Sequence, residues 1–144
     1  MKTGSLVLMT GLLAACASSS SPIRWAPPSD FSLAITDNPS SQHFDLSLTS
    51  KANTTLCLSK ESWPTESGLP LGFDGAQLKT SNGVKELLPT GSAYCSGGCG
   101  YMRIEPKQRL HGLIPYRAFG DQENITSDLN RKLIFEVHPF ICHD

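Results

Sequence analysis

The sequence predicts an all-β fold, on two observations. Apolar and polar residues alternate with period two in several short segments, which indicates strands with one buried face. Gly, Pro and Asn separate these segments, and no segment shows a sustained helical period, although residues 125–131 have room for one helical turn. Short strands punctuated in this way favour an Ig-like antiparallel β-sandwich of seven to eight strands. A small closed β-barrel is the alternative.

The alternation is clearest in residues 31–36 and 44–49. Residues 76–79 and 84–88 flank Ser81-Asn82-Gly83, a turn that suits a tight hairpin. Residues 62–71 contain two prolines and a glycine, so we expect them to cross the surface between sheets. Tyr116 and Phe119 follow a strand and are expected to pack a corner of the sandwich. The remaining expected strands are 54–59, 101–105, 109–115 and 131–138, with a tail at 140–142.

The N-terminus begins Met1-Lys2, continues with an apolar stretch over residues 6–15 and ends in Leu13-Ala14-Ala15-Cys16. This run resembles the lipobox of bacterial lipoproteins. The stretch is too short to span a bilayer, which takes about 20 apolar residues. The resemblance implies a signal peptide over residues 1–15 and lipidation of Cys16, by a diacylglyceryl group on the thiol and an acyl chain such as palmitate on the new amino terminus.

Lipidation has consequences for location. Two or three acyl chains together give lasting membrane attachment, whereas one holds weakly. In the lipoprotein family an Asp after the cysteine favours inner-membrane retention, and here Ala17 and Ser18 follow. The resemblance therefore implies the periplasmic face of the outer membrane of a Gram-negative bacterium. The Ser- and Pro-rich remainder of residues 16–29 is expected to be a flexible tether, and residues 30–144 a single domain.

Five cysteines are present, and four remain once Cys16 is assigned to lipid. An even number in an oxidising compartment predicts two disulfides. We favour Cys95 with Cys99 and Cys57 with Cys142, because two glycines let the first pair fold back, although sequence alone permits three pairings. Cys-Ser-Gly-Gly-Cys lacks metal-ligand spacing, so we expect no metal and no cofactor.

Charge and motifs exclude several functions. Twelve Lys and Arg balance thirteen Asp and Glu without a basic patch, so no nucleic-acid partner is expected. The chain has no Gly-x-Ser-x-Gly elbow, no His-Glu-x-x-His motif and no paired carboxylates. We therefore expect no catalytic residues and no enzymatic activity.

The loop over residues 91–101 is the candidate contact element. It is rich in glycine, is closed by the short disulfide and carries a tyrosine on each side. Pre-ordering lowers the entropy lost on association, and Tyr gives contact area at low rotamer cost. The alternative is a purely structural role, in which the disulfide stabilises the end of a hairpin. The candidate partner-binding residues are Tyr94, Ser96, Gly97, Gly98 and Tyr101.

In its lipobox, size and strand-rich pattern, the chain resembles the periplasmic immunity lipoproteins that protect bacteria from type VI secretion effectors. The resemblance implies a monomer that binds and inhibits a protein partner, such as a lipase effector, by occlusion. A structural or assembly lipoprotein of an envelope complex and a lysozyme inhibitor are the alternatives.

The anchor makes the first testable prediction. Replacing Cys16 by Ser removes the lipid-bearing thiol, so the protein should leave the membrane fraction while the domain stays folded. Cell fractionation with immunoblotting measures this. A Cys16→Ser protein that still sediments with membranes would contradict the lipid anchor.

Overall fold

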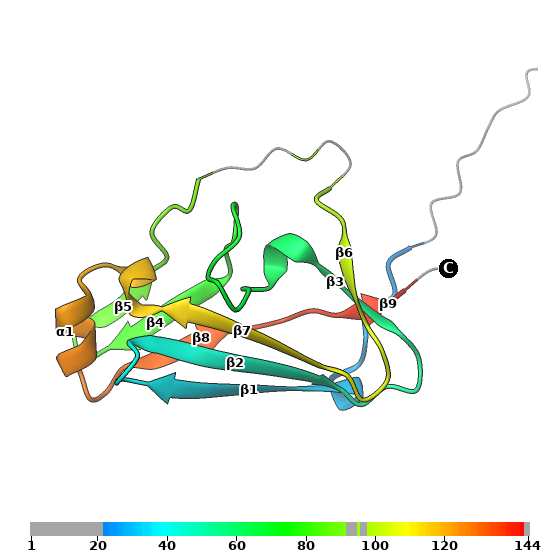
Figure 1. Cartoon of the computed structure of the whole chain (residues 1–144), viewed down its shortest axis with the longest axis horizontal. Coiled ribbons are helices and arrows are strands. Elements are labelled where there is room, and N and C mark those ends of the chain that lie inside the picture. Colours follow the sequence, from blue (N-terminus) through cyan, green and yellow to red (C-terminus); the bar gives the residue numbers. More distant parts are fainter. Residues whose placement is uncertain (1–21, 92–94, 96–97, 143–144) are drawn as a thin grey trace, which may run out of the picture.

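The computed structural model describes residues 22–91, 95 and 98–142. These residues form nine strands, one short α-helix and three 3₁₀ turns (Figure 1). The strands are β1 (Phe31–Asn38), β2 (His43–Ser50), β3 (Leu56–Ser59), β4 (Ala76–Thr80), β5 (Gly83–Glu86), β6 (Tyr101–Ile104), β7 (Arg109–Pro115), β8 (Lys132–Phe135) and β9 (Phe140–Ile141). The helical elements are η1 (Pro28–Asp30), η2 (Lys60–Ser62), η3 (Tyr116–Phe119) and α1 (Gln122–Ser127).

The strands pair into three antiparallel sheets, with orders β1-β2-β7, β5-β4-β8 and β6-β3-β9. The first sheet forms one layer, and the other two lie end to end against it, joined by the chain that runs from β8 into β9 (Figure 1). In each sheet the first and last strands are not paired with each other, so no sheet closes on itself. The predicted antiparallel β-sandwich is therefore confirmed, and the closed barrel is excluded.

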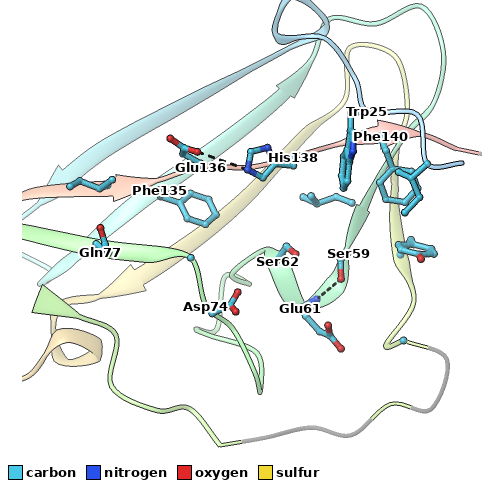
Figure 2. Close-up of a pocket in the computed structure, with 16 residues that line it drawn as sticks. Trp25, Ser59, Glu61, Ser62, Asp74, Gln77, Phe135, Glu136, His138 and Phe140 are labelled. Carbon is cyan, nitrogen blue, oxygen red and sulfur yellow. Dashed lines mark hydrogen bonds and ion pairs between the residues drawn. The ribbon is translucent and has the colours of Figure 1, made fainter.

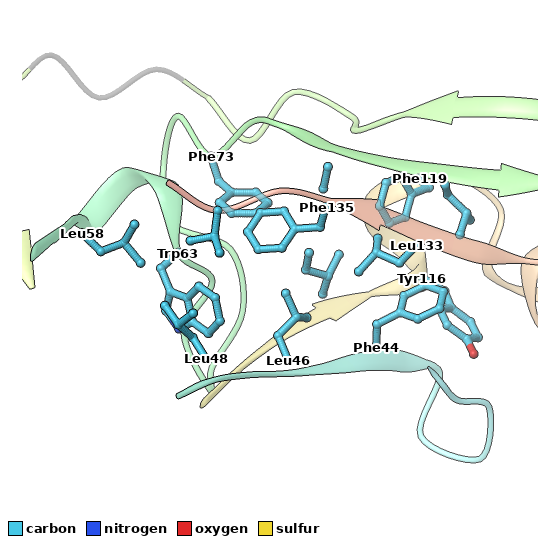
Figure 3. Close-up of a cluster of buried hydrophobic side chains, with 14 of the residues drawn as sticks. Phe44, Leu46, Leu48, Leu58, Trp63, Phe73, Tyr116, Phe119, Leu133 and Phe135 are labelled. Carbon is cyan, nitrogen blue, oxygen red and sulfur yellow. The ribbon is translucent and has the colours of Figure 1, made fainter. Parts of the chain in front are cut away.

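The hydrophobic core fills the space between the layers (Figure 3). Phe44, Leu46 and Leu48 of β2 point into it and are at most 1% exposed. Leu133 and Phe135 of β8 face them from the second layer. Strand residues two apart share a face, so the period-two pattern of the sequence corresponds directly to this burial. Tyr116 and Phe119 are also buried, as predicted for a packed corner.

The predicted hairpin turn is confirmed. Thr80 pairs with Gly83 in the β4–β5 ladder, which leaves Ser81 and Asn82 as the two loop residues. Gly83 has φ of +115°, a conformation that L side chains rarely adopt. A glycine at this position therefore allows the tight connection.

The helical turn lies earlier than expected. The pattern indicates residues 125–131, whereas α1 begins after the N-cap residue Asp121 and ends at Ser127. The Asp121 carboxylate accepts hydrogen bonds from the backbone N–H groups of Glu123 and Asn124, at 3.0 and 3.3 Å. No helix within the described residues is long and apolar enough to cross a membrane.

The prediction that residues 62–71 cross the surface is wrong for Trp63 and Pro64. Trp63 is only 2% exposed and Pro64 is fully buried. The Trp63 indole N–H donates to the carbonyl oxygen of His111 at 3.2 Å. A Cβ at Gly112 would lie 2.2 Å from the carbonyl oxygen of Pro64, so only glycine lets the segment approach β7 this closely. The crossing thus closes the core instead of passing over it.

Both favoured disulfides are present. Cys57 on β3 is bonded to Cys142, directly after β9, across a sequence separation of 85 residues. Cys95 is bonded to Cys99 across a separation of 4 residues. In the chain-entropy treatment the long loop stabilises the fold by about 4 to 5 kcal/mol, and the short loop by less.

The tether, predicted to extend to residue 29, ends before residue 24. Trp25 forms a β-bridge with Phe140. The Ala26 N–H donates to the Pro139 carbonyl, and the Ile141 N–H donates to the Arg24 carbonyl, both at 2.9 Å. These backbone bonds satisfy the outer edge of β9. Residues 24–26 therefore belong to the folded domain, ahead of the boundary predicted at residue 30.

The close approach at Gly112 leads to a stability prediction. Gly112→Ala places a methyl group against a buried backbone carbonyl, which should lower the free energy of unfolding by about 2 kcal/mol or more. Urea denaturation followed by circular dichroism measures the change. An unfolding midpoint equal to that of the wild type would show that residues 63–65 can move aside without cost.

Candidate partner-binding groove

A groove of about 670 Å³ lies at the end of the sandwich where the sheet β6-β3-β9 meets the N-terminal segment (Figure 2). Five stretches of the chain contribute to it, and they are distant from one another in sequence. The lining residues are Ile23 and Trp25; Leu58, Ser59, Glu61 and Ser62; Asp74, Gly75 and Gln77; Gly98 and Tyr101; and Ile134, Phe135, Glu136, His138 and Phe140.

Three aromatic side chains form one wall of the groove. Phe140 is nearly buried, at 8% exposed, and is flanked by two rings that are not. Its centroid lies 6.1 Å from that of Trp25 and 5.0 Å from that of Tyr101, both in edge-to-face geometry. Trp25 and Tyr101 are 59% and 57% exposed. Phe140 thus holds two solvent-facing aromatic rings in fixed positions.

Exposed apolar side chains are concentrated at this groove. Nine large hydrophobic side chains in the described residues are exposed, and four of them line it: Ile23, Trp25, Tyr101 and Ile134. Single exposed apolar residues are ordinary on protein surfaces, but a group of them around one concavity is typical of a binding site. The groove is therefore the strongest candidate site on the described surface.

The groove is also acidic. Glu61, Asp74 and Glu136 contribute carboxylates, and no Lys or Arg is among the described lining residues. Glu136 lies 3.9 Å from the imidazole of His138, and both side chains are more than 70% exposed. Such an exposed pair contributes little to stability. The lining therefore carries an excess of negative groups beside an aromatic wall.

Local sequence explains how these groups reach the groove. Successive side chains alternate across the extended segment 132–138, so Leu133, Phe135 and Val137 are buried while Glu136 and His138 are exposed. On the opposite side, the Ser59 hydroxyl accepts a hydrogen bond from the Glu61 N–H at 3.4 Å and begins η2. This cap places the Glu61 side chain at the groove.

The candidate contact residues from the sequence fall into two groups. Gly98 and Tyr101 line the groove, whereas Tyr94, Ser96 and Gly97 lie outside the described residues.

The sulfur atoms of Cys95 and Cys99 lie within 4.8 Å of a Glu61 carboxylate oxygen. Because these sulfurs are joined in a disulfide, they present no thiolate to a metal ion.

Sequence reasoning missed most of the groove. Trp25 lies within the predicted tether, and Glu61, Asp74 and Glu136 are isolated acidic residues in the sequence. One signal was available, since a tryptophan is unusual in a Ser- and Pro-rich linker that has nothing to pack against. The acidic residues carry no such signal, because only the fold brings them together.

A second polar cluster lies at the other end of the domain, around Arg131. Its guanidinium Nε lies 2.9 Å from an Asp37 oxygen and 2.9 Å from the Tyr116 hydroxyl, which itself donates to Asp37. Arg131 Nη1 also donates to the carbonyls of Thr126 and Asp128, each at 2.8 Å. The Arg131 side chain is 6% exposed. The cluster joins β1, η3 and the end of α1, and we interpret it as structural.

The Tyr116 hydroxyl in this cluster has a shifted pKa. Burial of the ring and the hydrogen bond to the Asp37 carboxylate raise the pKa to about 12, against an opposing effect of Arg131. Burial lowers the pKa of Arg131, but the interactions with Asp37 and Tyr116 together outweigh it and raise the pKa, so Arg131 stays positively charged. The network is therefore complete at neutral pH.

No protein-family model, curated protein or solved structure matches this chain.

The raised pKa of Tyr116 predicts a pH dependence of stability. Between pH 10 and about 12 the unfolded phenol ionises while the folded one stays protonated, so stability present below pH 10 should fall by about 2 to 3 kcal/mol as pH rises. Tyr116→Phe should flatten this decline. Urea denaturation at stepped pH measures it, with Tyr101→Phe, at the other end of the domain, as the matched control. Equal slopes in wild type and Tyr116→Phe would contradict the assignment.

Proposed function

We propose that this protein is a lipid-anchored periplasmic binding protein that inhibits an antibacterial effector enzyme, as immunity lipoproteins do. The observation that carries the proposal is the gathering of Ile23, Trp25, Tyr101 and Ile134 around one groove. Large exposed aromatic side chains are the usual anchors of protein interfaces. The effector class we favour is a lipase delivered by a type VI secretion system.

The proposed mechanism is occlusion without catalysis. Trp25 and Tyr101 are already held against Phe140, so little conformational entropy is lost when a partner covers them. The disulfide of Cys57 and Cys142 restrains the position of Phe140 in this wall, because it links the end of β9 to β3. A rigid aromatic wall of this kind can block the entrance of an enzyme active site.

The anchor supports the same function. Ile23 at the groove lies seven positions after Cys16, and a fully extended chain of that length reaches about 25 Å. A groove tethered this closely to the lipidated residue meets its partner at the membrane surface. That is the surface which a periplasmic lipase attacks.

A protection assay tests the proposal. Antibacterial lipase effectors from the same genome are directed to the periplasm of cells with and without this protein, and viable counts are compared. The wild type should restore growth against its cognate effector. Equal killing in both strains for every effector would overturn the immunity function, and co-purification with envelope-complex subunits or with lysozyme would then favour an assembly or lysozyme-inhibitor role.

Variants at the groove sharpen this assay. Trp25→Ala and Tyr101→Ala should each weaken effector binding by about tenfold or more, because a central aromatic anchor contributes roughly 2 kcal/mol. Leu129→Ala is the matched control, since Leu129 is 91% exposed but lies outside the groove. Isothermal titration calorimetry measures the affinities. Unchanged affinity in both groove variants would place the interface elsewhere.

A further inference from the structure

We infer that the groove accepts a cationic segment of the partner, in which an apolar side chain is flanked by Arg or Lys. This inference rests on the proposed function and adds the chemistry of the occupant. It combines two features of the groove that are independent of each other: its aromatic wall and its three carboxylates, none of which is paired with a Lys or Arg of the described residues.

Two of the carboxylates in the groove have no cation beside them in the described part of the chain. Within the described residues, no Lys, Arg or His nitrogen lies within 4.0 Å of the Glu61 or Asp74 carboxylate, whereas Asp37 is paired with Arg131 and Asp45 with His43. Glu136 on the facing segment lies 3.9 Å from the exposed imidazole of His138 and from no other cationic group of the described residues. Glu61 and Asp74 lie across the groove from Glu136 in Figure 2. A cation that enters the groove therefore meets carboxylates on both sides.

The floor of the groove supplies the apolar half of the site. The buried side chains of Leu58 and Phe135 form this floor, and Phe140 lies at its junction with the aromatic wall. The exposed rings of Trp25 and Tyr101 complete that wall. A volume of about 670 Å³ is within the range of sites that enclose a large side chain with its neighbours. An aromatic ring also attracts an arginine placed over its face. The wall thus favours the same cationic occupant as the carboxylates.

The same features argue against the membrane as the occupant. Exposed Trp and Tyr side chains are common at lipid interfaces, but there they accompany basic residues that attract anionic headgroups. Here the aromatic side chains accompany Glu61, Asp74 and Glu136, which repel such headgroups. We therefore commit to a protein segment and make the membrane an outcome of the test.

The two tryptophans of the chain allow a direct experiment. Trp25 lines the groove, whereas the Trp63 indole is buried and hydrogen-bonded to His111, so it serves as an internal reference. The unlipidated full-length Cys16→Ser protein is titrated with the peptide acetyl-Gly-Arg-Phe-Arg-Gly-amide, and both indole N–H signals are followed by NMR. Saturable movement of the Trp25 signal, with Trp63 unmoved, is the expected result.

Matched peptides and variants separate charge from apolar contact. Replacing both Arg by Glu, or Phe by Gly, should abolish the movement of Trp25. Glu61→Gln combined with Asp74→Asn should weaken binding about three- to tenfold, because each exposed ion pair contributes a few-fold. Glu66→Gln combined with Glu123→Gln removes the same charge outside the groove and should leave binding unchanged. Added salt should weaken binding of the Arg peptide.

Three results would overturn the inference. The first is no Trp25 movement with the Arg peptide, and the second is equal binding of the Glu peptide. The third is saturable movement with phosphatidylcholine vesicles but not with the Arg peptide, which would make the membrane the occupant. None of these depends on the protection assay, so a groove that rejects cationic peptides while the protein still protects cells would leave the proposed function standing.

Discussion

The position of β9 is the constraint on which the groove depends. β9 has two residues, and its ladder with β3 contains two residue pairs, too few to hold a terminal strand by hydrogen bonding alone. The disulfide of Cys57 and Cys142 adds a covalent link at this point. Residues 24–26 then bond to the outer edge of β9, which places Trp25 against Phe140. One covalent bond therefore organises the aromatic wall.

The two ends of the sandwich are stabilised by different chemistry. At the end with α1, the guanidinium of Arg131 is buried and its donors reach Asp37, Tyr116 and two backbone carbonyls. At the groove end, Glu61 and Asp74 are without such a cation among the described residues. A buried charge must be paired and hydrogen-bonded by groups within the fold, whereas an exposed charge is hydrated and stays available to bind a partner. This contrast separates the structural cluster from the candidate binding site.

Much of the fold could be predicted because its signals are local. The alternation in residues 44–49 places Phe44, Leu46 and Leu48 on one face, and the structure buries all three. The errors at residues 62–71 and in the tether have a common cause in contacts between distant segments. Pro64 suggested a surface crossing, yet the absence of a side chain at Gly112, 48 positions later, opens the space that buries it.

The sequence by itself determined the strand pattern and the tight turn before Gly83, because both depend on residue type and spacing along the chain. It favoured one of three cysteine pairings, and the structure contains that pairing. Only the tertiary structure decided where a partner could be held. The groove combines residues from five separate stretches, between Ile23 and Phe140. Its shape and charge arise from how the sheets pack, and no single stretch carries that information.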